Sequence, residues 1–213
     1  MTPGRLRVGV LVSGEGTNLQ AIIDSVHGQG GIEVVCVGSS RFAARGLERA
    51  RDAGIETAVF ATADYGDRVE RDRALGDWLD AHAVDLVVLA GFMELLGSDV
   101  IARYRGRIVN VHPALLPAFP GLRAIERALE HGVRVTGVTV HFVDEGVDSG
   151  PIILQRAIDL PYAAAIAEVE SRVHEVEHEL LPRAIRMIAR GLVRLDPSDP
   201  RRALIEEPVD AGH

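Results

Sequence analysis

The sequence predicts an α/β protein with an open, mostly parallel twisted sheet, helices on both faces, and an antiparallel extension in the C-terminal part. Up to residue 112, short runs rich in valine and leucine alternate with segments whose apolar residues recur at helical spacing. One run, residues 85–90, is almost continuously apolar, which is typical of a parallel strand covered on both faces. After residue 132, two strand-like segments are joined by only a short turn, which favours antiparallel pairing.

The predicted elements follow one another in a regular order. Strands are expected at residues 6–12, 33–38, 55–60, 85–90 and 108–111, with helices at 19–26, 43–53, 64–82 and 99–104. A helix at 123–131, strands at 133–143 and 152–158, a long helix at 162–190 and an edge strand at 192–195 complete the chain. Right-handed crossovers bring the carboxyl ends of parallel strands to one edge of the sheet, where ligands bind in such folds.

The composition indicates a soluble, cytoplasmic protein with one domain over residues 1–195 and a C-terminal tail over 196–213. Its 213 residues are 47% hydrophobic, which is enough for a sizeable core. A net charge of −8 and a pI near 5.5 argue against nucleic acid or an anionic membrane as a partner, and no apolar run is long enough to span a bilayer. The single cysteine, Cys36, excludes an internal disulfide and a cysteine-based zinc site, and we expect it in the core.

A polar turn, Ser-Gly-Glu-Gly-Thr-Asn at residues 13–18, links the first strand to the first helix. This arrangement aims backbone N–H groups and a helix N-terminus at an anion. Gly14 and Gly16 would let the backbone approach the ligand, while Thr17 and Asn18 add side-chain donors. The spacing matches neither the dinucleotide-binding nor the ATP-binding glycine pattern, so neither NAD nor ATP is indicated. From spacing alone, an ordinary tight turn is an equally good interpretation.

The strongest candidate for a reactive centre is the end of the strand at 108–111, which a proline-rich loop follows. Asn110 and His112 are two residues apart, so their side chains lie on the same side of an extended segment. An amide donor beside a titratable imidazole suits a carbonyl oxygen that becomes an oxyanion. Asp148, in the turn at 144–151, would favour the imidazolium if held close to it. The alternatives are a structural Asn beside a packed His, and a turn in which Asp144 or Asp148 only caps backbone N–H groups.

The remaining candidates have simpler explanations. His174 and His178 are four residues apart on the last predicted helix, and a surface pair is favoured over a metal site. His141 lies within a strand, where a hydrogen-bonded core histidine is expected. The chain has no nucleophile-elbow pattern and no metal-ligand cluster, which indicates direct transfer between two bound substrates.

Four segments carry a resemblance to a known family. They are Ser-Gly-Glu-Gly-Thr-Asn-Leu-Gln at 13–20, Leu-Ala-Gly-Phe-Met at 89–93, Asn-Val-His-Pro-Ala-Leu-Leu-Pro at 110–117 and Asp-Ser-Gly-Pro at 148–151. In order and spacing they resemble the phosphoribosylglycinamide formyltransferases, and the similarity covers about residues 6–195. The resemblance implies formyl transfer from 10-formyltetrahydrofolate to the amine of glycinamide ribonucleotide in purine biosynthesis. It implies no metal, two small-molecule substrates, and a monomer or homodimer.

The same resemblance assigns roles to individual residues. Asn110 and protonated His112 would stabilise the tetrahedral oxyanion, and Asp148 would keep His112 charged and assist proton transfer. The ribonucleotide would be bound by Gly16, Thr17, Asn18 and Glu177, and the folate by Arg68, Met93, Glu94, Leu95, Leu96, Asn110, Asp144 and Asp148. Glu94 stands where the family commonly has a basic residue, so the expected folate contact at this position is through the backbone.

Three other functions share some of these features. Formyltetrahydrofolate deformylase has a similar centre but carries an N-terminal regulatory domain, whereas five residues precede the first expected strand here. Methionyl-tRNA formyltransferase adds a C-terminal tRNA-binding domain, and the acidity of this chain is unsuited to RNA. A non-catalytic nucleotide- or folate-binding module would not need Asn110, His112 and Asp148 together.

Overall fold

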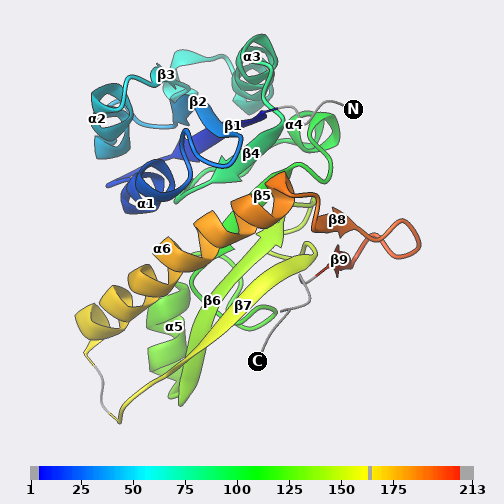
Figure 1. Ribbon diagram of the computed structural model, residues 1–213. Helices are drawn as coiled ribbons and strands as arrows, with labels where there is room; N and C mark the ends of the chain where they lie inside the picture. The colour runs from blue at the N-terminus through cyan, green and yellow to red at the C-terminus, as the bar shows by residue number, and fades with distance from the viewer. Residues whose placement is uncertain (1–4, 163–164, 207–213) are drawn as a thin grey trace.

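A seven-stranded sheet forms the centre of the computed structural model, which describes residues 5–162 and 165–206 (Figure 1). The strand order is β3-β2-β1-β4-β5-β6-β7. The strands are β1 (Leu6–Val12), β2 (Ile32–Ser39), β3 (Glu56–Val59), β4 (Leu86–Leu89), β5 (Ile108–His112), β6 (Val135–Phe142) and β7 (Ile152–Asp159). β1 to β5 are parallel, while β6 is antiparallel to β5 and to β7, so the expected fold class is confirmed.

Helices cover both faces of this sheet. One face carries α1 (Thr17–Ser25), α2 (Arg45–Asp52), α5 (Ala124–His131) and α6 (Ile166–Ala189), and the other carries α3 (Arg68–Ala81) and α4 (Ser98–Arg103). Alternate residues of β1 enter the two cores, with Val10 in one and Leu11 in the other. All four residues of β4 are buried, as the continuous apolar run predicts. Figure 1 shows α6 lying along β6 and β7 beside α1.

The order of the strands places the ligand-binding edge. β1 lies between β2 and β4. From β1 the chain adds β2 and β3 on one side, and it then returns to the other side of β1 to add β4 and β5. The carboxyl ends of β1 and β4 diverge into loops on opposite sides, which creates a crevice. The polar turn after β1 and the loop after β4 therefore border the same space.

Cys36 confirms the expectation of a core thiol. It is fully buried in β2 among residues of the α3 side of the sheet. Burial, aided by the nearby Glu56 carboxylate, raises the pKa of the thiol to about 12. A thiol that stays protonated to this extent is a poor nucleophile.

The C-terminal part differs from the expectation. Residues 193–195 do not add an edge strand to the large sheet, because β8 (Val193–Leu195) pairs instead with β9 (Ala203–Ile205) in a separate antiparallel hairpin. Residues 196–206, expected to belong to the tail, complete this hairpin, and 207–213 lie outside the described residues. A pairing between two three-residue segments is too short to leave a periodic signal in the sequence.

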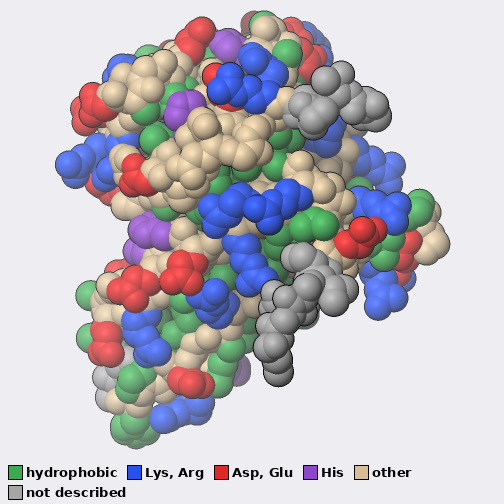
Figure 2. All heavy atoms as spheres, in the orientation of Figure 1, with side chains coloured by type: hydrophobic (Ala, Val, Ile, Leu, Met, Phe, Trp, Pro, Cys, Tyr) green, Lys and Arg blue, Asp and Glu red, His purple; other side chains and the backbone are tan. Residues whose placement is uncertain are grey.

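The surface view adds the charge distribution. Figure 2 shows basic and acidic side chains interspersed over the visible face rather than gathered by sign. Within residues 5–162 and 165–206, no helix is long and apolar enough to cross a membrane.

Candidate functional site

The turn after β1 leaves the start of α1 open to a ligand. Gly16 is the N-terminal capping position of α1, with a left-handed φ of 72°, and no side chain caps the helix. The first backbone N–H groups of α1 therefore keep their capacity to bind an anion. Glu15 does not oppose this, because its side chain is 70% exposed and pairs with Arg45 of α2 at 3.4 Å.

Two of the predicted ribonucleotide residues meet in space. Asn18 Nδ2 donates to Glu177 Oε2 at 3.0 Å, although 159 positions separate the two residues in the chain. His174 Nδ1 lies 3.1 Å from the same carboxylate oxygen. Hydrogen bonding to Glu177 raises the pKa of His174, although burial opposes the shift. His174 is exposed and its ring stacks on that of His178 with centroids 6.2 Å apart, as expected for a surface pair. Glu177, by contrast, is buried and links this pair to Asn18 in the turn.

Gly16→Ala is expected to destabilise the protein by about 1–3 kcal/mol, because a non-glycine residue is strained at this φ. A Cβ at Gly16 would also lie 2.5 Å from the Cα of Gly46 in α2, so the turn must move. Gly14→Ala is the matched control, since its Cβ would meet nothing within 4 Å. Urea unfolding of both variants checks the prediction, and equal midpoints would contradict it.

The loop after β4 is hydrogen-bonded directly to the turn after β1. Ser13 N donates to the Gly91 carbonyl at 3.0 Å, and Met93 N donates to Ser13 Oγ at 2.9 Å. Ser13 is buried, and its hydroxyl also contacts that of Ser40 at 2.7 Å. The two loops at the crevice are therefore one connected structure.

A cavity of about 370 Å³ opens beside this loop at the end of β5. Asn110, His112 and Asp148 all line it, so the structure brings the three predicted catalytic side chains together. Four exposed apolar side chains surround them, with exposed fractions between 52% and 70%: Met93, Leu95, Leu122 and Val147. An apolar rim around convergent polar groups is typical of a small-molecule site.

His112 is held between two oxygen atoms. Its Nε2 donates to the Phe119 carbonyl at 2.9 Å, and its Nδ1 lies 3.2 Å from Asp148 Oδ2. Both ring nitrogens thus face acceptors, so the geometry suits the imidazolium, which carries a proton on each nitrogen. A ligand oxygen must share or replace one of these acceptors to receive a hydrogen bond from His112.

Asn110 is engaged in a similar way. Its Nδ2 contacts His141 Nε2 at 3.2 Å and donates to Asp148 Oδ1 at 3.3 Å. His141 Nδ1 donates to the Phe142 carbonyl, and its Nε2 lies close to both Asn110 Nδ2 and Asp148 Oδ1, the latter at 3.6 Å. These contacts are at the long end of the hydrogen-bond range, so an incoming oxyanion can replace them at small cost.

Asp148 connects all of these groups. It adopts φ 51°, a left-handed conformation that Asp tolerates better than most residues, and its Oδ2 accepts from Gly121 N at 2.7 Å. Burial raises the pKa of Asp148. The His141 ring, the Gly121 N–H and the charge of His112 outweigh this effect and lower the pKa to about 2. Asp148 is therefore a carboxylate at neutral pH.

This depressed pKa predicts a pH-dependent stability. A carboxyl whose pKa is lower in the folded protein stabilises it above the unfolded pKa, near 4, and loses that effect as the pH falls towards about 2. The difference is about 2 kcal/mol. Unfolding free energies of the wild type and Asp148→Asn should differ by a constant amount above pH 4 and converge between pH 4 and 2. A gap independent of pH over that window would contradict the assignment.

The proline-rich loop supplies the backbone groups that hold this centre. Its Phe119 carbonyl and Gly121 N–H bind His112 and Asp148 respectively. Thr139 of β6 fixes the start of the loop, since its Oγ1 donates to the Ala114 carbonyl at 2.7 Å and accepts from Leu116 N at 3.1 Å. The loop is thus positioned by the antiparallel strand next to β5.

Comparisons with known proteins identify the family of this chain. A family model described as formyl transferase matches residues 6–185. The chain belongs to the formyl transferase family. It is 44% identical to the phosphoribosylglycinamide formyltransferase of Haemophilus influenzae over 190 residues, which are 89% of this chain and 90% of that protein. The crystal structure of glycinamide ribonucleotide transformylase 1 from Symbiobacterium toebii superimposes with a TM-score of 0.91 at 45% identity, covering 97% of this chain and 96% of that one.

A more distant likeness concerns the fold alone. The formyltetrahydrofolate deformylase of Pseudomonas syringae superimposes with a TM-score of 0.87 at 22% identity, covering 95% of this chain and 66% of that one. The formyl transferase fold therefore also occurs in an enzyme named for a different reaction. Fold alone does not separate the two reactions, so the site residues must carry the argument.

In this member of the formyl transferase family, the predicted folate residues fall into two groups. Met93, Glu94, Leu95, Leu96, Asn110, Asp144 and Asp148 line the 370 Å³ cavity or an adjoining one of about 100 Å³. Arg68, by contrast, is exposed at the first residue of α3 and lines neither cavity. The structure thus brings the loop, the centre and the turn at 144–148 together, and leaves Arg68 at the periphery.

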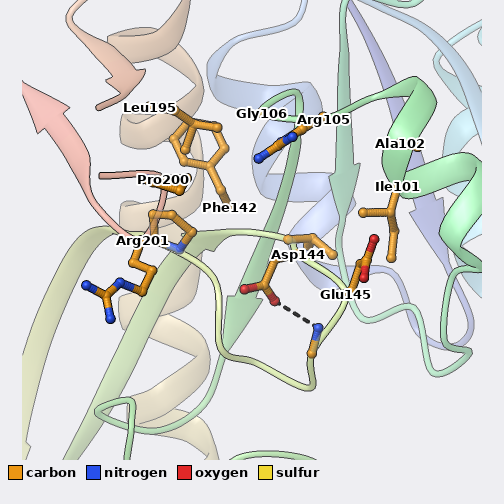
Figure 3. A pocket seen from close by; sticks show the side chains of 13 residues that line it. Ile101, Ala102, Arg105, Gly106, Phe142, Asp144, Glu145, Leu195, Pro200 and Arg201 are labelled. Carbon is orange, nitrogen blue, oxygen red and sulfur yellow. Dashed lines mark hydrogen bonds between the residues drawn. The ribbon is translucent and has the colours of Figure 1, made fainter. Parts of the chain in front are cut away.

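The turn at 144–148 also borders a further cavity of about 460 Å³, which none of the three central side chains lines (Figure 3). Figure 3 shows Asp144 reaching back to the turn, where its Oδ1 accepts from Gly146 N at 3.1 Å. The same atom accepts from Ser149 Oγ at 2.8 Å. Asp144 therefore caps the turn, as one interpretation of the sequence proposed, while it also lines the smaller site cavity.

Sequence reasoning missed the position of His141. It is buried and hydrogen-bonded as expected, but it lies opposite Asn110 in the β5–β6 ladder and 3.6 Å from Asp148 Oδ1. A prediction of the register between β5 and β6 would have placed His141 opposite Asn110. Among the described residues, no group of three or more His, Cys, Asp or Glu side chains is placed to hold a metal ion.

Proposed function

We propose that this chain transfers the formyl group of 10-formyltetrahydrofolate to the amine of glycinamide ribonucleotide, a step of purine biosynthesis. The observation that carries the proposal is the convergence of Asn110, His112 and Asp148 in one cavity. This cavity is bordered by the loop after β4, which is hydrogen-bonded to the anion-binding turn after β1. Two substrates placed on these neighbouring loops would meet at the three polar side chains.

The ribonucleotide fits the β1 side of the crevice. Its phosphate would bind the open N–H groups at Gly16, Thr17 and Asn18, where the α1 dipole favours negative charge. Glu177 lies beside this turn through its contact with Asn18 and would accept hydrogen bonds from ribose hydroxyls. The amine of the same substrate would then reach towards the end of β5.

The folate fits the apolar side. Its ring system would lie against the backbone and side chains of residues 93–96 and the turn at 144–148, which line the two adjoining cavities. The exposed Met93, Leu95, Leu122 and Val147 side chains offer apolar surface for its aromatic body. Glu94 lines the same space, and its negative charge disfavours a carboxylate of the folate next to it.

The chemistry follows from the charges at the centre. The amine attacks the formyl carbon, and the oxygen that becomes negative is stabilised by the Asn110 amide and the His112 imidazolium. Asp148, ionised at neutral pH, keeps the imidazolium in place and orients a water molecule that takes the proton lost by the amine. The proton then passes to the folate nitrogen as the tetrahedral intermediate collapses.

A formyl-transfer assay with 10-formyltetrahydrofolate tests the proposal. Product formation that requires glycinamide ribonucleotide is the expected result. Folate deformylation at the same rate without the ribonucleotide would identify a hydrolase instead. Binding of both compounds without turnover would identify a binding module.

A further inference from the structure

The loop after β4 is irregular in structure but firmly held. It contains no helix or strand between Leu89 and Ser98, and the side chains of Met93 and Leu95 are each 59% exposed. Its start is tied to Ser13, as described above. Its end is tied to α3, by two side chains that have no part in the mechanism proposed for the site.

These two side chains, Arg71 and Asp72, form a buried ion pair. Arg71 is 0% exposed and Asp72 2% exposed, and Arg71 Nε lies 2.7 Å from Asp72 Oδ1. This contact lacks hydrogen-bond geometry, and within the described part of the chain Arg71 Nε, Arg71 Nη1 and Asp72 Oδ1 have no hydrogen-bond partner. Removing two charges from water costs several kcal/mol per ion, and a buried pair rarely recovers more than that cost. General stability therefore gives no reason for this pair.

The ion pair is hydrogen-bonded to the backbone of the loop on both sides of Leu96. Arg71 Nη2 donates to the Leu95 carbonyl at 3.2 Å, and Gly97 N donates to Asp72 Oδ2 at 2.7 Å. A Cβ at Gly97 would lie only 2.6 Å from Asp72 Oδ2, so the close approach depends on glycine. The backbone of residues 95–97 is thus fixed by two hydrogen bonds to charged groups.

These two hydrogen bonds position one wall of the site. Leu95 and Leu96 line the smaller cavity together with Asn110 and Asp148, whereas Arg71 and Asp72 line neither site cavity. The ion pair therefore reaches the site only through the loop backbone. A shift of this backbone would displace the surface that meets the folate and leave the turn after β1 in place.

We propose that Arg71 and Asp72 are positioning residues for the folate, which set the affinity for this substrate by holding the backbone of residues 95–97. The proposal rests on the assignment of the folate to this loop. The proposal predicts different effects on the two substrates. Loss of the hydrogen bonds from Arg71 and Asp72 weakens folate binding, and it leaves ribonucleotide binding and the reactive centre unchanged.

The double variant Arg71→Met/Asp72→Leu tests this proposal. It removes both charges together, so that no buried charge is left unpaired, and such replacements are often neutral for stability. We expect a melting temperature close to that of the wild type, and a KM for 10-formyltetrahydrofolate raised about tenfold or more. The KM for the ribonucleotide, and kcat at saturating folate, should stay within about twofold of the wild-type values.

Three further variants separate positioning from a merely structural role. Arg71→Met/Asp72→Asn keeps an oxygen acceptor for Gly97 N and should recover part of the folate affinity. Gly97→Ala leaves the ion pair intact but displaces the loop from it, and should raise the folate KM. Asp77→Ala removes an exposed ion pair between Asp77 of α3 and Arg103 of α4, which are 2.9 Å apart, and should change neither KM.

The outcomes are distinct. Wild-type folate KM in a folded Arg71→Met/Asp72→Leu variant, or equal increases in both KM values, would overturn the positioning role. If the double variant fails to fold, an unchanged folate KM in Gly97→Ala would overturn it. A wild-type protein that binds no folate in a direct titration would refute the proposed function, and this inference with it.

Discussion

His112→Ala is expected to lower kcat for formyl transfer at least ~10²-fold, since oxyanion stabilisation and proton-transfer assistance are each of that order. The ring is 5% exposed and fills the space between the Phe119 carbonyl and Asp148, so no other cation of the centre can replace it. The loss should appear mainly in kcat at saturating substrates. The ribonucleotide KM should change little, because its binding groups lie on the turn after β1.

His131→Ala is the matched control for this variant. His131 is exposed at the end of α5, and its ring contacts that of Phe119 with centroids 5.9 Å apart. It therefore touches the same loop without reaching the centre, and its kcat should stay within about twofold of the wild type. Near-normal turnover in folded His112→Ala would show that the transfer does not use this ring.

Asp148→Asn is expected to lower kcat by a similar factor, on the order of 10²-fold, and to move the pH–rate profile towards acid. The amide keeps the size of the side chain and can still accept from Gly121 N. The same carbonyl oxygen would face His112 Nδ1, because Gly121 N and His112 Nδ1 share Asp148 Oδ2. The amide carries no negative charge, however, so it no longer favours the imidazolium over the neutral ring. Lower pH restores the positive charge, which is why part of the activity should return in acid.

The pH profile distinguishes this explanation from simple damage to the turn. Glu145→Gln removes a carboxylate from the same turn at a residue that lines neither site cavity, and should keep the wild-type profile. Thermal unfolding of both variants at pH 7 provides the check on folding. A loss of activity in Asp148→Asn that is the same at every pH would contradict the role assigned to its charge.

Local patterns in the sequence were sufficient for the fold class and for the main candidates. The alternation of apolar strands with amphipathic helices determines a parallel sheet, because each crossover must cover one face of it. The spacing of Asn110 and His112 places both side chains on one side of a strand whatever lies around them. Gly14 and Gly16 could be singled out because glycines between a strand and a helix let the backbone approach an anion.

Only the tertiary structure decided which distant residues meet. His141 joins the centre through the register of β5 against β6, and Glu177 meets Asn18 across 159 positions of the chain. The pairing of β8 with β9 and the hydrogen bonds from α3 to residues 95–97 likewise depend on contacts between separate segments. A residue's own sequence neighbours carry its secondary-structure preference, whereas register and packing are set by the whole chain at once. The sequence by itself therefore determined the parts of this site, and the packing of its loops decided how they are held.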